Sequence, residues 1–313
     1  MMSVLTSNLL LLLTAAIWGF AFVAQRVGMD YVGPFTFNGV RFALGAFSLV
    51  PLIFYFKQKD SAKVNNPHEL KSVFGAGVLA GSVLFLGASL QQIGLVYTTA
   101  GKAAFITCLY IVLVPMIGVF FKQHISLTTW LGSGITVVGL YLLCVKDSFF
   151  ISYGEMLELI GAFFWTIHIL LIDRFSRKVD VLKLSFFQFM TCSVLSLTTA
   201  LFIETISIDT LTEAVVPILY GGICSVGIAY TLQVVGQKNA QPSHAAIILS
   251  METVFAAIGG WIILNEKLGV QELLGCAIML AGMLLSQLTN INKSQITDNE
   301  VVLELPDSEQ AEI

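Results

Sequence analysis

Two charged residues lie inside long apolar stretches of this chain, where a charge requires a partner or a function. Glu252 is near the middle of the apolar run 243–264, and no basic residue neighbours it in sequence. Charged groups within hydrocarbon are costly, and they are found where protons, ions or substrates are handled. Glu252 is a candidate protonatable coupling site or counter-charge for a cationic solute. The alternative is a structural carboxyl group, hydrogen-bonded within a helix bundle.

Arg41 is the second such residue, about two helical turns into the apolar run 35–56. Its guanidinium could receive the carboxylate of a solute, pair with a buried acid, or reach the membrane interface on its long stem. We prefer the two structural interpretations, the ion pair and the interface. A charge swap between Arg41 and Glu252 would show whether the two groups meet.

Aromatic and amide side chains share helical faces in three other apolar runs. The spacing i, i+3 or i+4, i+7 groups Trp18, Phe22 and Gln25; Trp165, His168 and Ile172; and Tyr230, Gln233 and Gln237. Polar groups on one stripe of an apolar helix should face protein or water rather than lipid. For any single residue we prefer packing and interhelical hydrogen bonding as its role. Together they predict a cavity for amphiphilic or aromatic metabolites.

The predicted substrate-binding residues combine these groups with residues of the third and fourth apolar runs. They are Trp18, Gln25, Arg41, Gln91, Tyr110, Trp165, His168, Tyr230, Gln233 and Glu252. No catalytic or metal-binding residue is predicted, because the five cysteines and four histidines are scattered and form no ligand pattern. No cofactor is predicted either.

The elements that position these residues follow from composition. Hydrophobic residues make up 56% of the 313 residues and charged residues 12%, with a mean hydropathy of +0.85, which excludes a soluble domain. A span needs roughly 20 apolar residues. Such runs predict an all-α polytopic membrane protein of ten transmembrane helices, at about 8–27, 35–56, 72–93, 102–121, 126–145, 154–173, 184–204, 214–236, 243–264 and 268–289.

Weak internal symmetry divides these spans into two sets. At an offset of 142, Gln91 matches Gln233 and the pair 103–104 matches 245–246; at an offset of 147, Trp18 matches Trp165 and Arg41 matches Gln188. We therefore predict two five-helix repeats, 8–145 and 154–289. Because five is odd, the second repeat must cross the membrane inverted, and inverted repeats let one protein adopt two mirror-related openings, the structural basis of alternating access.

Basic residues predict the orientation. With the connection around 57–71 placed inside, eleven Lys and Arg residues lie on that side and four on the other. This places both termini of a multi-pass cell-membrane protein in the cytoplasm. The N-terminal residues before Asn8 carry no Lys or Arg, so the first run is predicted to be a retained helix rather than a signal peptide. Residues 290–313 carry six acidic residues against Lys293 and predict a disordered cytoplasmic tail.

Several segments resemble the EamA-type transporters of the drug/metabolite transporter superfamily. They are 15–19, 38–42, 245–252 and 275–282, within a resemblance that covers about residues 8–289. The resemblance implies ten helices, a central cavity between the halves, and export or uptake of amino acids, other metabolites or drugs. The family often has proline directly after the glutamate of the ninth span, whereas this chain has Thr253; Pro115 in the fourth span is a candidate kink in the first half.

Three classes of function compete at this point. The leading hypothesis is a secondary transporter that moves a small organic metabolite by alternating access, with export as the expected direction and protons as a candidate coupling ion. The alternative is an integral membrane enzyme that acts on a lipid-linked substrate, although no His-Glu-x-x-His or Gly-x-Ser-x-Gly pattern is present. A channel would need a repeated filter or charge ring. The expected partners are a small-molecule substrate and the lipid bilayer, not nucleic acid, and the chain is expected to act as a monomer or homodimer.

Overall fold

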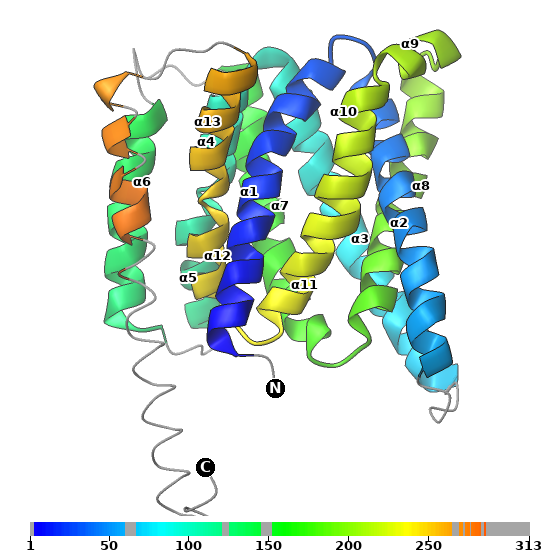
Figure 1. The fold of residues 1–313 in the computed structure, drawn as a ribbon, viewed down its shortest axis with the longest axis horizontal. Helices are drawn as coiled ribbons and strands as arrows, with labels where there is room; N and C mark the ends of the chain where they lie inside the picture. Colours follow the sequence, from blue (N-terminus) through cyan, green and yellow to red (C-terminus); the bar gives the residue numbers. More distant parts are fainter. Residues whose placement is uncertain are drawn as a thin grey trace, which may run out of the picture.

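The computed structural model describes residues 3–59, 67–120, 125–144 and 152–264, and residues 269–285 except 272, 276, 283 and 284. Every regular element among these residues is a helix, which confirms the all-α prediction. The elements are α1 (Val4–Gly28), α2 (Pro34–Lys59), α3 (Pro67–Tyr97), α4 (Ala100–Thr107), α5 (Tyr110–Phe120), α6 (Leu127–Cys144), α7 (Tyr153–Ser176), α8 (Val181–Ile203), α9 (Ile208–Glu213), α10 (Val215–Leu219), η1 (Tyr220–Tyr230), α11 (Thr231–Gln237), α12 (Pro242–Leu249) and α13 (Glu252–Ile263). They stand side by side as one bundle (Figure 1).

Eight helical segments in the described part are long and apolar enough to cross a membrane. They correspond to eight of the ten predicted spans: 4–28, 34–56, 70–97, 103–120, 153–176, 181–203, 215–237 and 242–263. The predicted fifth span corresponds to α6, and the predicted tenth to a shorter apolar helix at Leu273–Gly282, which includes residues outside the described part. Crossings at these two places stay a prediction.

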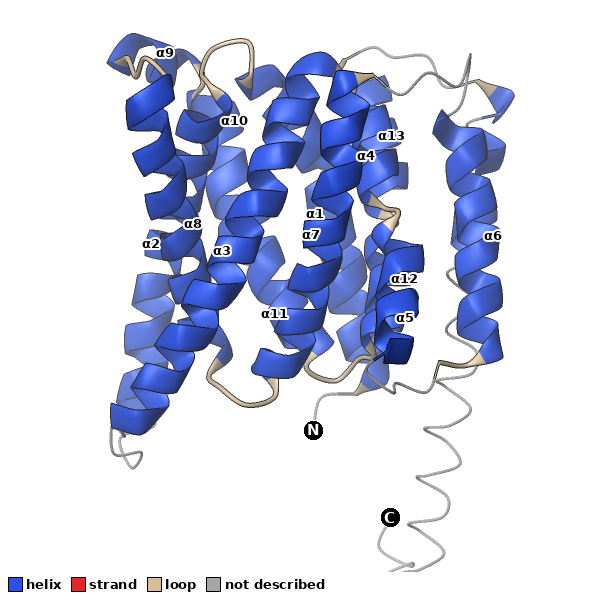
Figure 2. Cartoon of the chain, turned by 180° about the vertical axis from the view of Figure 1, so that it is seen from behind, coloured by secondary structure: helices blue, strands red, loops and turns tan. Residues whose placement is uncertain are grey.

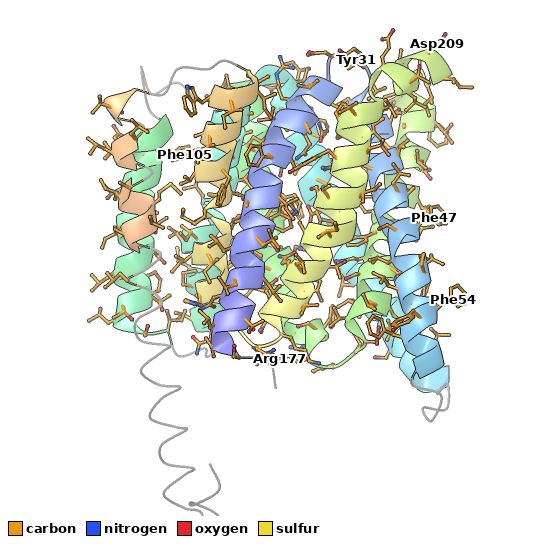
Figure 3. All side chains as sticks on the ribbon, viewed as in Figure 1. Tyr31, Phe47, Phe54, Phe105, Arg177 and Asp209 are labelled. Atoms are coloured by element: carbon orange, nitrogen blue, oxygen red, sulfur yellow. The ribbon has the colours of Figure 1, made fainter. Side chains whose placement is uncertain are left out.

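Large apolar side chains cover the outside of the bundle. On α2, Phe47 and Phe54 are each 60% exposed, and they point away from the other helices (Figure 3). Phe202 at the end of α8 is 84% exposed. An apolar surface that continues over many helices is a surface for lipid, because a water-soluble protein rarely exposes such a patch. The structure therefore supports the multi-pass membrane protein.

Two of the spans are broken in the middle. One span is divided into α4 and α5 at Cys108 and Leu109, and another into α12 and α13 at Ser250 and Met251 (Figure 2). At each break the helix tightens to hydrogen bonds between residues three apart: Leu109 N to Ile106 O and Met251 N to Ile248 O are both 3.1 Å. Such bonds satisfy the backbone where a regular turn ends.

The second break needs no proline. Thr253 stands where the resembled family often has one, yet the helix still ends at Leu249 and begins again at Glu252. The hydroxyl of Ser250 donates to Ile247 O at 2.7 Å, so this side chain bonds back to its own helix at the break. In the other span, Pro115 lies inside α5 rather than at the break. The two breaks are therefore made by backbone and side-chain hydrogen bonds, not by proline.

A third irregular span joins α10 and α11 through η1, a π-helix of 11 residues. Its glycines allow α2 to approach, because a Cβ on Gly222 would lie 2.7 Å from the Leu44 Cβ and 3.0 Å from Arg41 O. Three hydrogen bonds join η1 to α1: Thr14 Oγ1 to Ala229 O, Trp18 Nε1 to Ser225 O, and Tyr220 Oη to Ile17 O, at 3.2, 3.3 and 3.0 Å. π-Helical turns are rare in proteins, and where they do occur they are often part of a functional site.

Candidate solute-binding site

One pocket lies at the height of the two helix breaks. Side chains from most of the helices line it: Trp18, Phe22, Gln25, Arg41, Gln91, Thr107, Tyr110, Trp165, Ile169, Ser225, Tyr230, Gln233, Leu249 and Glu252. The space between them that no atom fills measures about 460 Å³, including the part that opens outward. Thr107, Tyr110, Leu249 and Glu252 are the residues that directly flank the breaks. The breaks therefore turn the ends of short helices toward the pocket.

Nine of the ten predicted substrate-binding residues line this pocket. The tenth, His168, is fully buried one layer behind it, where its Nε2 lies 3.0 Å from Gln188 Oε1 and its ring contacts those of Trp165 and Tyr230. Side chains three residues apart on a helix point in directions about 60° apart. This angle is enough to direct Trp165 at the pocket and His168 at α8.

Glu252 is the first residue of α13, is 3% exposed, and meets the other broken span. Its Oε1 accepts a hydrogen bond from Tyr110 Oη at 3.0 Å, and Cys108 Sγ lies 3.5 Å away. Cys108 Sγ also lies 2.8 Å from Thr253 Oγ1 and 3.5 Å from Ser250 O. The carboxyl group is thus held by weakly polar neutral groups, and it forms no ion pair within the described part of the chain.

Arg41 is 2% exposed and does not reach the surface of the bundle. Its Nε donates to Asn38 Oδ1 at 2.9 Å, and its guanidinium carbon lies 5.0 Å and 5.5 Å from the ring centres of Phe42 and Phe37. Within the described residues it pairs with no carboxylate, so neither preferred interpretation holds in this structure: no snorkelling and no ion pair. The arginine lines the pocket beside two phenylalanine ring faces and an amide, and the side chains of Cys192 and Tyr230 are close enough to interact with its charge.

Three aromatic rings form the apolar wall of the pocket. The Tyr230 ring lies between the two tryptophans, with ring centres 4.5 Å from Trp18 and 6.2 Å from Trp165. Trp18 Nε1 donates a hydrogen bond to Ser225 O, whereas Trp165 Nε1 is buried and has no partner among the described residues.

Besides the charged residues and the aromatic rings, the pocket is lined by the amide groups of glutamine residues. Gln91 Nε2 lies 3.5 Å from Gln25 Oε1, a long hydrogen bond between α3 and α1. Gln233 is 1% exposed, and its Oε1 has no partner in the described part of the chain. An unpaired buried acceptor is costly, so a hydrogen-bond donor would be favoured beside the Oε1 of Gln233.

Two pocket residues escaped the sequence analysis for a physical reason. Thr107 was missed because its place depends on the break after it. Ser225 is five residues before Tyr230, and on a regular α-helix of 3.6 residues per turn the two would face different ways. The wider π-helical turn brings both to the pocket. Phe22 was placed on the right stripe but not included in the predicted set, and Ile169 and Leu249 gave no polar signal.

Glu158 was missed although the signal was present. It is a carboxyl group inside the apolar run 154–173, which is the rule that singled out Glu252. In the structure it is 0% exposed, and its Oε2 accepts from Thr107 Oγ1 at 3.2 Å. It is therefore joined to the pocket lining through one hydroxyl group.

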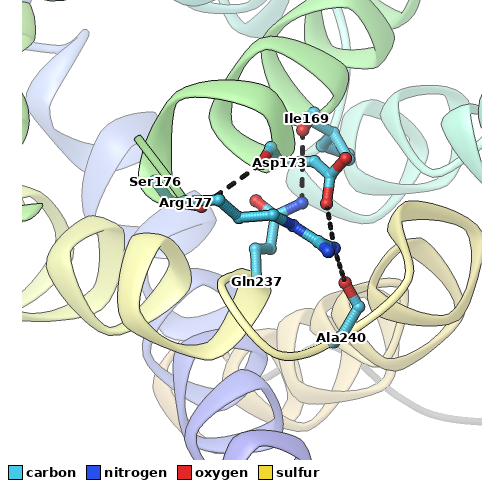
Figure 4. A network of polar contacts seen from close by, with 6 residues as sticks. All are labelled: Ile169, Asp173, Ser176, Arg177, Gln237 and Ala240. Carbon is cyan, nitrogen blue, oxygen red and sulfur yellow. Dashed lines mark hydrogen bonds and ion pairs between the residues drawn. The ribbon is translucent and has the colours of Figure 1, made fainter. Parts of the chain in front are cut away.

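A polar network closes the end of the bundle where α7 and α11 finish (Figure 4). Arg177 Nη2 lies 2.7 Å from Asp173 Oδ1 and 3.3 Å from Ala240 O, and Gln237 Nε2 donates to Ile169 O at 3.3 Å. Ile169 also lines the pocket. The network therefore connects one wall of the pocket to the end at which Arg177 lies in Figure 3.

A bundle of apolar membrane helices around a small pocket of mixed aromatic, amide and charged groups is the architecture expected of a membrane protein that binds a small solute. The chain belongs to the EamA-like transporter family, whose model matches residues 5–145 and 152–288. An uncharacterized transporter of Archaeoglobus fulgidus is 31% identical over 290 residues, covering 91% of this chain and 86% of the relative. An uncharacterized transporter of Bacillus subtilis, YoaV, is 24% identical over 279 residues, covering 87% and 94%.

A solved crystal structure shares the fold. It superposes with a TM-score of 0.74 over 90% of this chain and 96% of its own, at 16% identity. The family and its relatives establish that the chain is a membrane transporter.

Proposed function

We propose that this transporter is a secondary carrier that moves a small amphiphilic metabolite, such as an amino acid or a drug-like compound, by alternating access. The observation that carries the proposal is the pocket: it has a buried guanidinium that pairs with no carboxylate among the described residues, a buried carboxyl group, two polar atoms that have no partner among the same residues, and an aromatic wall. A solute with charged or polar ends and an apolar body matches these groups. Pockets of this kind are typical of small-molecule sites.

Repeat symmetry supports the ten-span, two-repeat architecture that alternating access would use. At the offset of 142, the bonds of the first break recur at the second: Ile111 N to Cys108 O at 2.9 Å corresponds to Thr253 N to Ser250 O at 3.1 Å. The fifth and tenth predicted spans also pack reciprocally. A Cβ on Gly139 would lie 2.7 Å from Gly275 O, and one on Gly282 would lie 2.8 Å from Gly132 O. Two related halves that exchange shapes are the basis of such carriers.

Thermal shift on the purified protein is the first test. Amino acids, nucleosides, polyamines and cationic drugs are screened, and a bound solute raises the unfolding temperature with its concentration. Arg41→Gln should weaken binding of a solute with a carboxylate by about 10- to 100-fold, because a charge-assisted hydrogen bond is lost. Arg177→Gln is the matched control, since Arg177 lies outside the pocket. Equal affinities of the wild type and Arg41→Gln for every solute that binds would contradict the proposed site.

Flux through proteoliposomes then tests the carrier mechanism. Saturation and counterflow are expected of a carrier and not of a channel, and a membrane enzyme would give a product instead. Export is the proposed direction, so net movement should be observed into inside-out vesicles. The failure of counterflow with a solute that binds in the pocket would contradict alternating access.

The proposed orientation has its own test. At the end of the bundle where α7 and α11 finish, the described residues include Arg177, Lys178, Lys183 and Lys238, and we place this end in the cytoplasm of a cell-membrane protein. Cysteines introduced at Lys178 and at Asp209, which lies at the opposite end, are labelled in intact cells with an impermeant maleimide (Figure 3). Labelling at Asp209 and not at Lys178 is expected; the reverse would invert the topology.

A further inference from the structure

A second buried carboxyl group lies on the side of the pocket away from the Arg177 network. Glu158 is in the second turn of α7, which begins at Tyr153, and is 0% exposed. Its Oε1 has no hydrogen-bond partner within the described residues, and its Oε2 has only the hydroxyl of Thr107. A buried carboxyl group with one neutral partner is poorly compensated as an anion and has a free oxygen for a proton.

Glycine residues on α3 and α7 leave the space that the Glu158 side chain occupies. A Cβ on Gly94 of α3 would lie 2.6 Å from Glu158 Oε1, so any other residue there would occupy the space of the carboxyl group. One turn earlier on α7, a Cβ on Gly154 would lie 2.9 Å from Gly94 O. The close approach of α3 and α7 therefore depends on two glycines. The carboxyl group is enclosed at this contact rather than turned outward.

Thr107 connects the enclosed carboxyl group to the pocket. It is the last residue of α4, it lines the pocket, and its Oγ1 lies 3.2 Å from Glu158 Oε2. Three residues further, across the break, Tyr110 Oη donates to Glu252 Oε1 at 3.0 Å and also lines the pocket. The two buried carboxyl groups thus reach one pocket from the two sides of a single helix break, each through one hydroxyl group.

The other ionisable groups on the elements around Glu158 do not pair with it within the described side chains. They are Lys71 and Tyr97 on α3, Cys108 at the break, Tyr110 on α5, and Tyr153, Glu155, His168, Asp173 and Arg174 on α7; the side chains of His68 and Glu69 on α3 and of Lys102 on α4 lie outside the described residues. Glu155 bonds to Ser152 N, His168 to Gln188, and Tyr97 packs on Tyr153. Thr107 is therefore the only described polar contact of the carboxyl group.

We infer that Glu158 is a second proton-binding residue, placed between Glu252 and the end of the bundle opposite Arg177, and that it exchanges its proton with the pocket through Thr107. A proton on Glu158 Oε2 passes to Thr107 Oγ1 when the Thr107 hydroxyl has turned from Glu158 toward the pocket, and the Thr107 proton passes to water there, so one proton moves and no group is oxidised. The inference rests on the proposed function for its purpose, but the exchange itself requires no solute.

Infrared difference spectroscopy after a pH jump tests the inference on purified protein, with the proton as the only probe. The carbonyl band of protonated carboxyl groups should contain two buried components, one removed by Glu158→Gln and the other by Glu252→Gln. Glu155→Gln is the control on the same helix and should leave both. If the Glu158→Gln spectra match the wild type at every pH, Glu158 does not exchange a proton and the inference is overturned, whether or not the protein transports the solutes tested.

The hydroxyl of Thr107 gives a second, kinetic test. Thr107→Val should slow the appearance of the Glu158 component by tenfold or more, and Thr107→Ser should restore it. Equal rates in all three proteins would overturn the path through Thr107. These variants keep the carboxyl group, so the test remains available if Glu158→Gln does not fold. Loss of counterflow with unchanged proton exchange would count against the proposed carrier and not against this inference.

Discussion

The two helix breaks have similar backbones and different side chains. At an offset of 142, Cys108 corresponds to Ser250 and Tyr110 to Glu252, and two hydrogen bonds between residues three apart recur at both breaks; the first break has one more, from Val112 N to Leu109 O at 3.0 Å. The breaks meet, since Cys108 Sγ lies 3.5 Å from Ser250 O and Tyr110 bonds to Glu252. Sequence symmetry has therefore kept the frame of the pocket in both halves.

The difference lies in what each break presents to the pocket. The first presents hydroxyl groups, from Thr107 and Tyr110, whereas the second presents an apolar side chain and a carboxyl group, from Leu249 and Glu252. The two breaks thus combine a similar frame with different chemistry, and only the second carries a carboxyl group of its own. The carboxyl group next to the first break comes from another helix: Glu158 of α7, which is hydrogen-bonded to Thr107.

The largest effect on solute flux is expected from substituting Glu252 or Tyr110, the two residues that meet between the breaks. Glu252→Gln removes the ionisable group and should lower solute flux by about 10- to 100-fold, because interactions of charged groups contribute about 1.5–3 kcal/mol. Tyr110→Phe removes one neutral hydrogen bond and should cost about fivefold. Both are measured as counterflow in proteoliposomes with a solute that binds. A greater loss in Tyr110→Phe would show that the hydroxyl side, not the carboxyl side, carries the function.

Eight of the spans and most of the residues that line the pocket could be predicted, because they depend on local signals. Apolar runs mark spans, and helical spacing placed Trp18, Gln25, Tyr230 and Gln233 on the stripes that line one pocket. The breaks could not be predicted, because the signal that was looked for was proline. Thr253 replaces it at one break, and the bonds that hold the breaks come in part from the other half of the chain.

Arg41 shows a second limit of the sequence. A buried guanidinium suggested a carboxylate partner or an exposed head, but its surroundings are Asn38 and the faces of two phenylalanines. Which side chains meet across the bundle is decided by tertiary packing, and no spacing along one helix contains that information. Glu158 is the opposite case, since its type and position were sufficient to identify it.

Substitution of Gly19 tests whether α1 must pack closely against the second break. α1 crosses α13 there, and a Cβ on Gly19 would lie 2.6 Å from Glu252 O and 2.8 Å from Ala256 N. Because these are backbone atoms, Gly19→Ala should lower the free energy of unfolding by about 1–3 kcal/mol and displace Glu252. Gly75→Ala is the control: nothing lies within 4 Å of its Cβ, so thermal unfolding should show no loss. Equal midpoints for the two variants would contradict the close crossing.

The helices α2 and α8 correspond in the two halves, and their N-termini are capped differently. Glu204, at the end of α8, accepts from Phe35 N and Thr36 N of α2, each at 2.8 Å. Asp180 caps its own helix, α8, through Lys183 N at 2.9 Å, on the exposed surface. Glu204→Ala should therefore lower the free energy of unfolding by about 1–2 kcal/mol, and Asp180→Ala by about half as much. Thermal unfolding measures both, and a larger loss for Asp180→Ala would argue against the cross-bundle cap.

The smallest effect is expected at the ion pairs on the two ends of the bundle. Arg177 is half exposed, but it joins Asp173 at 2.7 Å and also reaches Ala240 O beyond α11, whereas Arg26 joins only Asp30, within one helical turn at 3.1 Å. Arg177→Gln should lower the free energy of unfolding by less than about 1 kcal/mol, and Arg26→Gln by close to nothing, since exposed pairs contribute little.

Salt separates the two contributions at Arg177. Screening weakens the pair with Asp173, while the bond that links α7 to the loop after α11 is to a neutral carbonyl and is less affected. The difference in unfolding midpoint between Arg177→Gln and the wild type should therefore shrink at high salt without vanishing. A difference that vanishes would mean that the ion pair alone contributes, and that the link from the end of the bundle to the pocket wall at Ile169 depends on Gln237.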